Sequence, residues 1–247
     1  MGSMSWKLRI GLALFGASAA LCAIHYEAFK DAHNLFFYLA LDVAFVPVQV
    51  LLVTLIIGEL MDERDKEGML RKLNMVIGAF FSEVGHDLIK KVVAGGGEGG
   101  ELAGGLGVTL KWTSGDYQRA AKFVEGRQFQ FQPSPEQWDQ LKSFLVARRT
   151  FILGLLQNPN LLEHERFTDL LWAVTHLTEE LEARSGFSAL PETDRRHLIG
   201  DLGRAFGLLI REWLAYMQHL KTAYPYIYSL NVRTNPFNPA AEAAVKE

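Results

Sequence analysis

Two long stretches of apolar residues dominate the first quarter of the chain. Residues 8–24 contain one charged side chain, Arg9, and residues 35–58 contain one, Asp42. A helix needs about 20 mainly apolar residues to cross the hydrocarbon core of a bilayer, and about 17 is the lower limit. We therefore expect residues 6–58 to form a transmembrane hairpin, with spans at about 8–24 and 35–58.

After the second span, apolar residues recur at intervals of three and four, which is the spacing of an amphipathic helix. They are Leu70, Leu73, Ile77, Phe80, Phe81, Val84 and Leu88. Because the chain has no helix-stop signal at the end of the span, we predict that the helix continues as an amphipathic connecting helix over residues 59–93. Residues 94–107 contain eight glycines and are predicted to form a flexible linker.

Residues 108–224 have the pattern of a helical bundle. Ser134 followed by Pro135 is typical of a capped helix start. Helices are predicted over residues 116–124, 135–157, 161–184 and 192–223. Alternating apolar positions at 108–112 and 129–131 indicate two short strands that would form a small β-hairpin. The predicted fold class is mostly α, a transmembrane hairpin followed by a cytosolic bundle, with residues 225–247 as a C-terminal strap and tail.

The distribution of charge orients the hairpin. Four basic residues follow the second span closely, whereas the intervening loop, residues 25–34, contains only Lys30. The four are Arg64, Lys66, Arg71 and Lys72. By the positive-inside rule we expect both termini to lie in the cytosol. The net charge of −3 shows no basic surplus that would indicate nucleic-acid binding.

The N-terminus leaves an alternative to the first span. Residues 1–5 begin with Met1-Gly2-Ser3-Met4, an expression scar that we expect to be disordered. The basic residues Lys7 and Arg9, with small residues at 18–20, also fit a cleaved signal peptide, after which the second span would still deliver the C-terminus to the cytosol. The single cysteine, Cys22, excludes an intrachain disulfide.

Polar residues inside the second span are candidates for function. Asp42 and Gln49 are seven residues apart and share one helix face, with Pro47 between them. A carboxylate in the bilayer costs about 2.5–3.5 kcal/mol on insertion scales, so Asp42 should face protein or water. It would line a pore, or it would be a protonated packing residue, for example one that reaches Ser18 of the first span. Gln49 fits an interhelical hydrogen bond.

Histidines and carboxylates on the third and fourth bundle helices form a candidate metal set. They are His176, Glu179, Glu180, His197 and Asp201. Such residue types bind metals inside helical bundles. On the third helix, Glu165, Asp169, His176 and Glu180 form one polar stripe. Val174, a core position, lies on the opposite side of the helix from Glu165, so this polar stripe should face away from the core. A solvated surface is therefore the main interpretation, with an interface or a metal site as alternatives.

Aromatic residues suggest interaction surfaces. Trp172 lies on the polar stripe of its helix, which suggests that a neighbouring subunit or another segment of the chain covers it. The C-terminal strap supplies the other candidate interface residues, which are Tyr224, Tyr226, Tyr228, Arg233 and Phe237. Their alternative role is to pack the strap over the bundle, with Arg233 pairing a carboxylate.

Three segments carry a resemblance to a known family. They are Leu52-Val-Thr-Leu-Ile-Ile57, the block from Lys72 to Gly85, and the ending from Tyr224 to Phe237. Together they resemble an uncharacterised family of prokaryotic two-span inner-membrane proteins with a cytosolic helical domain. The resemblance implies a location in the inner membrane and transfers no activity.

The leading hypothesis for function is a homo-oligomeric membrane assembly, either an ion-conducting pore or a scaffold. The alternative is a membrane-tethered helical domain that acts as a metal-dependent enzyme or recruits an unidentified protein partner. The sequence contains no nucleophile elbow and no HExxH motif, which disfavours an enzyme. Membrane lipid is the expected surrounding, and no cofactor is expected.

Overall fold

The computed structural model describes residues 6–96, 99–161, 164–238 and 240–245, apart from the side chains at 60–67, 69–71, 99–100 and 160. The predicted tag, residues 1–5, lies outside this range, as do the side chains of Arg64, Lys66 and Arg71. The protein is mostly helical and divides into two compact units, residues 1–66 and 67–247. Helix α2 (Ala32–Phe80) passes from the first unit into the second.

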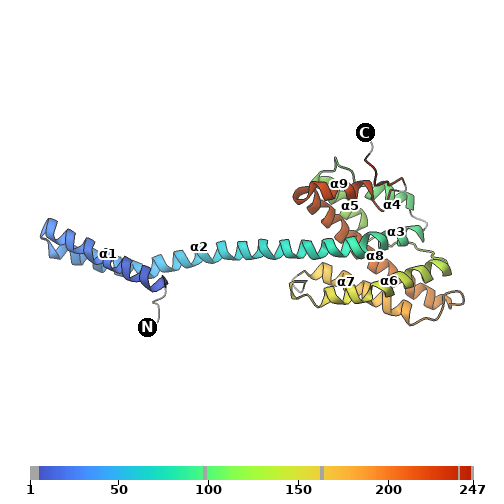
Figure 1. Ribbon diagram of the computed structural model, residues 1–247, viewed down its shortest axis with the longest axis horizontal. Coiled ribbons are helices and arrows are strands. Elements are labelled where there is room, and N and C mark those ends of the chain that lie inside the picture. Colours follow the sequence, from blue (N-terminus) through green and yellow to red (C-terminus); the bar gives the residue numbers. More distant parts are fainter. Residues whose placement is uncertain (1–5, 97–98, 162–163, 239, 246–247) are drawn as a thin grey trace. The chain divides into compact units, whose positions relative to one another are not determined.

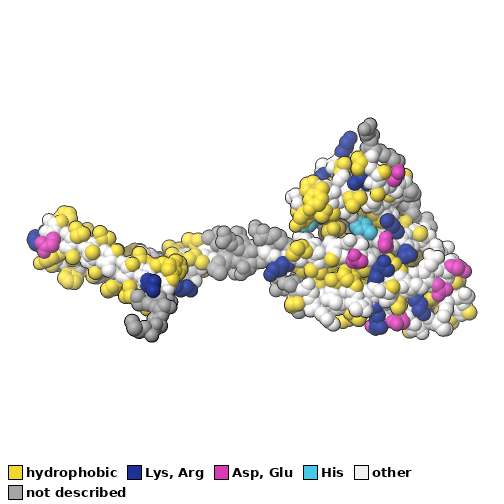
Figure 2. Space-filling model, in the orientation of Figure 1, with side chains coloured by type: hydrophobic (Ala, Val, Ile, Leu, Met, Phe, Trp, Pro, Cys, Tyr) yellow, Lys and Arg dark blue, Asp and Glu magenta, His cyan; other side chains and the backbone are white. Residues whose placement is uncertain are grey.

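The first unit contains two helices that are long and apolar enough to span a membrane. Helix α1 (Trp6–Phe29) and the part of α2 from Ala32 to Glu59 both meet this criterion. The predicted loop at 25–34 is shorter than expected, because Lys30, with a positive φ of 51°, and Asp31 alone separate the helices. The apolar side chains of both helices are exposed and cover their surface almost without charge (Figure 2). Such a surface suits lipid or another protein rather than water.

Helix α2 continues beyond Gly58 as predicted, and a π-helix (Phe81–Gly85) and α3 (His86–Ala94) follow it without a break. The π-helix was not anticipated from the apolar spacing. It adds one residue to the turn, so that the neighbouring side chains Phe80 and Phe81 are both fully buried. A Cβ at Gly85 would lie 2.4 Å from Cδ1 of Phe81, so a larger residue at this position would force the Phe81 ring to shift.

The glycine-rich segment is not simply a linker. Helix α4 (Gly99–Leu106) forms within it and packs against α5 (Ser114–Val124). The side chains of Leu102 and Leu106, four residues apart, are buried in the core. The prediction of a flexible segment at 94–107 was therefore wrong for this helix, because two well-spaced leucines outweigh the low helix propensity of glycine.

The predicted β-hairpin is absent from the described part of the chain, which contains no β-strand. Phe131 forms only an isolated antiparallel bridge with Gly96. Phe129 and Phe131 do point to the same side, but both pack edge-on against Phe206 of α8, at centroid distances of 5.0 and 5.2 Å. The alternation therefore identified an extended segment with one buried face, without a partner strand.

Three helices form the centre of the second unit, α6 (Pro135–Leu156), α7 (Glu165–Glu182) and α8 (Glu192–Ala223), as shown in Figure 1. Their starts follow local chemistry. The Ser134 hydroxyl accepts a hydrogen bond from the Gln137 backbone N–H, and the Gln137 side-chain oxygen accepts one from the Ser134 backbone N–H, which confirms the predicted capped start. Nδ1 of His164 accepts a hydrogen bond from the Phe167 amide at the start of α7.

Helix α8 is the long central element, and α7, α5, α3 and α9 (Pro225–Arg233) all pack against it. Helix α9 was not predicted within the C-terminal strap. Pro225 occupies its first turn, where a missing amide hydrogen is tolerated, and Tyr228 is buried against the bundle. The mixture of tyrosines, asparagine and proline in this segment gives no clear helical spacing of apolar residues, so the helix was not recognised from the sequence.

Candidate metal centre

The contact between α7 and α8 carries a series of charged pairs that fixes the register of the two helices. Arg184, just after the end of α7, lies across from Asp194 of α8, with 2.5 Å between Nη2 and Oδ1. His176 lies across from Asp201, and farther along Arg166 lies across from Glu212. Because rising numbers on α7 meet falling numbers on α8, the two helices are antiparallel. This register brings residues from both helices to one point on the seam.

At that point two histidines and one aspartate converge, and we call them the histidine–aspartate cluster: His176, His197 and Asp201. Nε2 of His176 is 3.5 Å from Oδ2 of Asp201, and Nε2 of His197 is 3.3 Å from the same oxygen. The ligating atoms of all three residues lie within 4.8 Å of one another. His197 and Asp201 are one turn apart on α8, so they share a face, while His176 reaches them from α7.

Asp201 is the unusual member of this cluster. Its side chain is only 3% exposed, although both histidines are about half exposed. Its Oδ1 faces the guanidinium of Arg204 at 3.4 Å. Its Oδ2 is buried and makes no hydrogen bond. A buried carboxylate oxygen is costly unless a donor or a cation satisfies it, so this atom requires either protonated imidazoles or a bound cation beside it.

Glu180 flanks the cluster from α7. Its Oε2 lies 3.6 Å from Nε2 of His197, and its Oε1 lies 3.9 Å from Nε2 of His176. Arg184 donates a hydrogen bond of 2.8 Å to Oε2, and this contact lowers the pKa of the Glu180 carboxyl. Glu180 is therefore an ionised carboxylate that can serve as a further ligand or as an acceptor for the histidines.

Glu179, the remaining member of the predicted metal set, is not part of the cluster. Its carboxylate lies 3.6 Å from the guanidinium of Arg149, which also approaches Glu182 at 3.3 Å. The structure thus brings together four of the five predicted residues. The polar stripe of α7 does lie outside the core, as expected, and His176 and Trp172 are both exposed. His176, at the edge of this polar stripe, nevertheless contacts Asp201 of α8.

The geometry fits a transition-metal ion. Two donors bound to one tetrahedral ion at about 2.0–2.1 Å are about 3.3 Å apart, close to the observed distances between each histidine and Asp201. Two imidazoles with one carboxylate are the donors of catalytic zinc sites and of non-haem iron(II) sites, which keep positions open for substrate or water. Of the described residues, these three form the group with this spacing.

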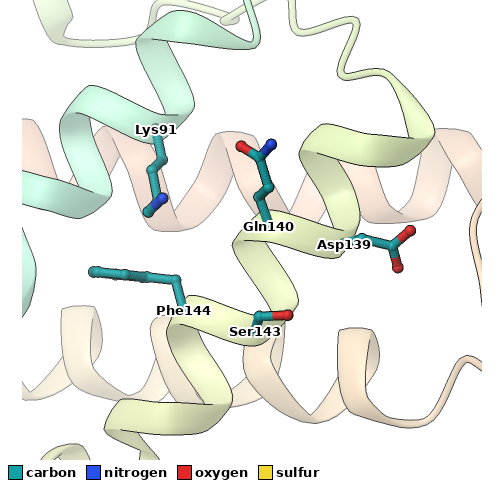
Figure 3. Close-up of a pocket in the computed structure, with 5 residues that line it drawn as sticks. All are labelled: Lys91, Asp139, Gln140, Ser143 and Phe144. Carbon is teal, nitrogen blue, oxygen red and sulfur yellow. The ribbon is translucent and has the colours of Figure 1, made fainter.

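Two other cavities are weaker candidates. One of about 470 Å³ lies between α3 and α6 (Figure 3). There Nζ of Lys91 lies 5.4 Å from the ring centre of Phe144, while the carboxylate of Asp139 points away from both. The other, of about 310 Å³, is lined in part by Arg166 and Arg211, and the Arg166 guanidinium lies 3.3 Å from the carboxylate of the buried Glu212. Burial raises the pKa of Glu212, against the opposing effect of Arg166.

The intramembrane candidates lie on α2, in the first unit. Asp42 and Gln49 are both exposed, and the helix continues through Pro47 without interruption. Among the described residues of the first unit, neither the Asp42 nor the Gln49 side chain makes a hydrogen bond or an ion pair. Their role as pore-facing residues stays a prediction.

The aromatic candidates divide into exposed and buried residues. Trp172 is 60% exposed, and Tyr224 and Tyr226 are also exposed. Tyr228 is buried, and its hydroxyl donates to the carbonyl of Thr109 at 2.8 Å and contacts the Tyr117 hydroxyl at 2.9 Å.

The other two strap residues serve packing within the second unit. Phe237 packs edge-on against the buried Trp213. Arg233 donates to the carbonyl oxygens of Ser229 and Ala243. The packing role considered for the strap thus describes Phe237 and Tyr228, whose side chains hold the C-terminus on the bundle, whereas these two hydrogen bonds of Arg233 join α9 to the tail and go to carbonyl oxygens rather than to the expected carboxylate.

Comparison with known proteins covers both units. Residues 2–61 match the N-terminal helical domain of MJ1433, and residues 69–233 match the C-terminal helical domain of the uncharacterized protein MJ1433. The chain is 40% identical over 238 residues to uncharacterized protein MJ1433 of Methanocaldococcus jannaschii, with 96% of each protein covered. No solved structure matches the chain. The resemblance to an uncharacterised family with a helical domain is confirmed, while the family names do not mention membrane spans. The chain belongs to the MJ1433 family.

Proposed function

We propose that this chain is a membrane-anchored protein whose C-terminal helical domain binds a divalent transition-metal ion, of the zinc or iron(II) type, at His176, His197 and Asp201. The observation that carries the proposal is the buried Oδ2 of Asp201, which makes no hydrogen bond and is approached by two imidazole nitrogens. A bound cation would satisfy this oxygen. With three protein ligands the ion would keep open positions, which suits hydrolytic or oxidative chemistry more than a purely structural role.

Metal analysis of the full-length protein, purified without chelators, tests the proposal. We expect close to one equivalent of metal per chain, and its loss in His176→Ala, His197→Ala and Asp201→Asn. Glu179→Gln and His33→Ala are matched controls, because Glu179 pairs with Arg149 and His33 lies on α2 in the first unit. Less than about a tenth of an equivalent in the wild-type protein, after reloading with zinc or iron(II), would refute the proposal.

The N-terminal helices are proposed to anchor this domain in a prokaryotic inner membrane with both termini in the cytosol. Two helices long and apolar enough to span support the anchoring, and the basic residues after the second span support the orientation. A C-terminal fluorescent protein, which matures only in the cytosol, should fluoresce, and a C-terminal alkaline phosphatase should be inactive. The opposite pair of results would reverse the orientation.

A second candidate function is the homo-oligomeric assembly, a pore or scaffold. The exposed carboxylate of Asp42, on an otherwise apolar helix, supports it, because a second copy would shield this group from lipid. The mass of the protein in nanodiscs tests this candidate. A discrete assembly of four or more chains that is weakened in Asp42→Ala would support it. A monomer, or an assembly with unchanged mass and ion flux in Asp42→Ala, would exclude the pore.

A further inference from the structure

The seam between α7 and α8 contains a groove beside the histidine–aspartate cluster, which we call the seam groove. It has a volume of about 450 Å³, within the range of small-molecule sites. It is lined by Asp169, Trp172, Ala173 and His176 of α7 and by Arg204 and Leu208 of α8. The groove lies between two of the charged pairs of the seam, His176 with Asp201 on one side and Arg166 with Glu212 on the other.

We infer that the seam groove binds a small ligand with an anionic group, a carboxylate or phosphate, attached to a flat apolar group. The inference rests in part on the proposed metal site, because the anionic group would use an open position of that metal. Three observations support it: the residues shared with the cluster, the cation in the lining, and the exposed tryptophan.

His176 belongs to both the cluster and the lining of the groove. Arg204 also connects them, because its guanidinium lies 3.4 Å from Oδ1 of Asp201 while the same side chain lines the groove and is 64% exposed. A ligand oxygen that bound the metal would therefore lie beside a guanidinium. Arginine donates to carboxylates and phosphates through two parallel N–H groups, so this end of the groove is built for an anion.

Trp172 supplies a flat apolar surface. Its indole is exposed although it belongs to a well-packed bundle, and Ala173 and Leu208, both partly buried, continue the apolar lining. An aromatic or other flat group on this surface would remove the exposed indole from water, and stacking of this kind would tighten binding further. The exposure of Trp172 is thereby explained by a ligand rather than by a second copy of the chain.

Asp169 sets the polarity of the groove. It precedes His176 by seven residues on α7, about 10 Å along the helix axis. The end of the groove that carries the Asp169 carboxylate therefore lies away from the histidine–aspartate cluster, and Trp172 lies between Asp169 and the cluster. The ligand should carry its anion toward His176 and Arg204, and a hydrogen-bond donor at its far end would meet Asp169.

Calorimetric titration of the full-length, zinc-loaded protein in nanodiscs tests the inference, with phenyl phosphate as the probe. Inorganic phosphate and benzyl alcohol separate the anion from the ring. We expect phenyl phosphate to bind most tightly, and Trp172→Ala and Arg204→Gln each to weaken binding at least about tenfold. Arg211→Gln, seven residues along α8 and outside the groove, is the matched control and should bind as the wild type does.

Metal content, measured on the same samples, separates this inference from the metal proposal. Full metal content without binding of phenyl phosphate, or with equal binding in Trp172→Ala and Arg204→Gln, would overturn the groove and leave the metal site intact. Binding that depends on both residues in a metal-free protein would support the groove while the metal proposal fails. An oligomer that dissociates in Trp172→Ala, without probe binding, would assign Trp172 to a second copy and overturn the inference.

Discussion

Leu106→Ala is the most direct test of whether the glycine-rich segment belongs to the folded core. The Leu106 side chain is fully buried at the end of α4. The Asn235 amide, which is also buried, donates to the Leu106 carbonyl at 3.1 Å and ties α4 to the chain after α9. In a flexible linker the same truncation would change the free energy of unfolding very little.

The expected magnitude follows from burial. Truncation of a fully buried leucine to alanine costs about 2–5 kcal/mol. For a domain of this size each kcal/mol lowers Tm by about 2–4 °C, so Leu106→Ala should melt about 4–20 °C below the wild type. Leu110→Ala is the matched control, because this leucine is 57% exposed only four residues away. Its effect should stay within about 0.5 kcal/mol.

Thermal unfolding of the full-length protein in detergent, followed by circular dichroism at the helical minimum, provides the measurement. The two single variants should be compared in the same detergent with wild-type protein. If Leu106→Ala and Leu110→Ala melt at the same temperature, α4 does not contribute to the core and the packing described above is refuted.

Three further substitutions test other features by the same measurement. Gly85→Ala should cost about 1–3 kcal/mol, because its Cβ would clash with Phe81, whereas Gly154→Ala, with no atom near its Cβ, should be neutral or stabilising. Tyr228→Phe should cost about 1–2 kcal/mol, because it removes a buried hydroxyl that makes two hydrogen bonds. Glu212→Gln should raise Tm at pH 8 and leave it unchanged near pH 4. Burial raises the folded-state pKa of this carboxyl, so its ionisation destabilises the fold only as the pH rises above the unfolded-state pKa. A uniform effect at both pH values would contradict this reasoning.

Local signals in the sequence predicted the helices with clear starts and wide apolar faces. The apolar lengths of residues 8–24 and 35–58 identified both candidate spans, and Ser134 with Pro135 identified the start of α6. Helices α4 and α9 were missed because glycine and mixed aromatic residues have low helix propensity, and tertiary packing supplies what propensity does not. The β-hairpin was wrong because alternation identifies a buried face but not a partner strand.

The candidate site was predictable only as a set of residue types. Spacing placed His197 and Asp201 one turn apart, and helical phase correctly placed His176 away from the core of α7. The register between α7 and α8 is not encoded in either helix alone, since it depends on the chain between them and on packing across the seam. A residue at the edge of a polar stripe can therefore meet the buried side of a neighbouring helix, as His176 meets Asp201.

The Asp201 carboxylate can be satisfied in two ways, by protonated histidines or by a metal ion, and pH separates them. Imidazole nitrogens bind a metal only when they are unprotonated, so protons compete with the metal for His176 and His197. Zinc should therefore bind at least about tenfold more weakly at pH 5.5 than at pH 7.5, as measured by titration against a competing chelator of known affinity at each pH. His197→Ala should bind weakly at both values with a smaller difference between them. Equal zinc affinity at the two pH values in the wild-type protein would show that carboxylates alone hold the ion, and it would remove both histidines from the metal site.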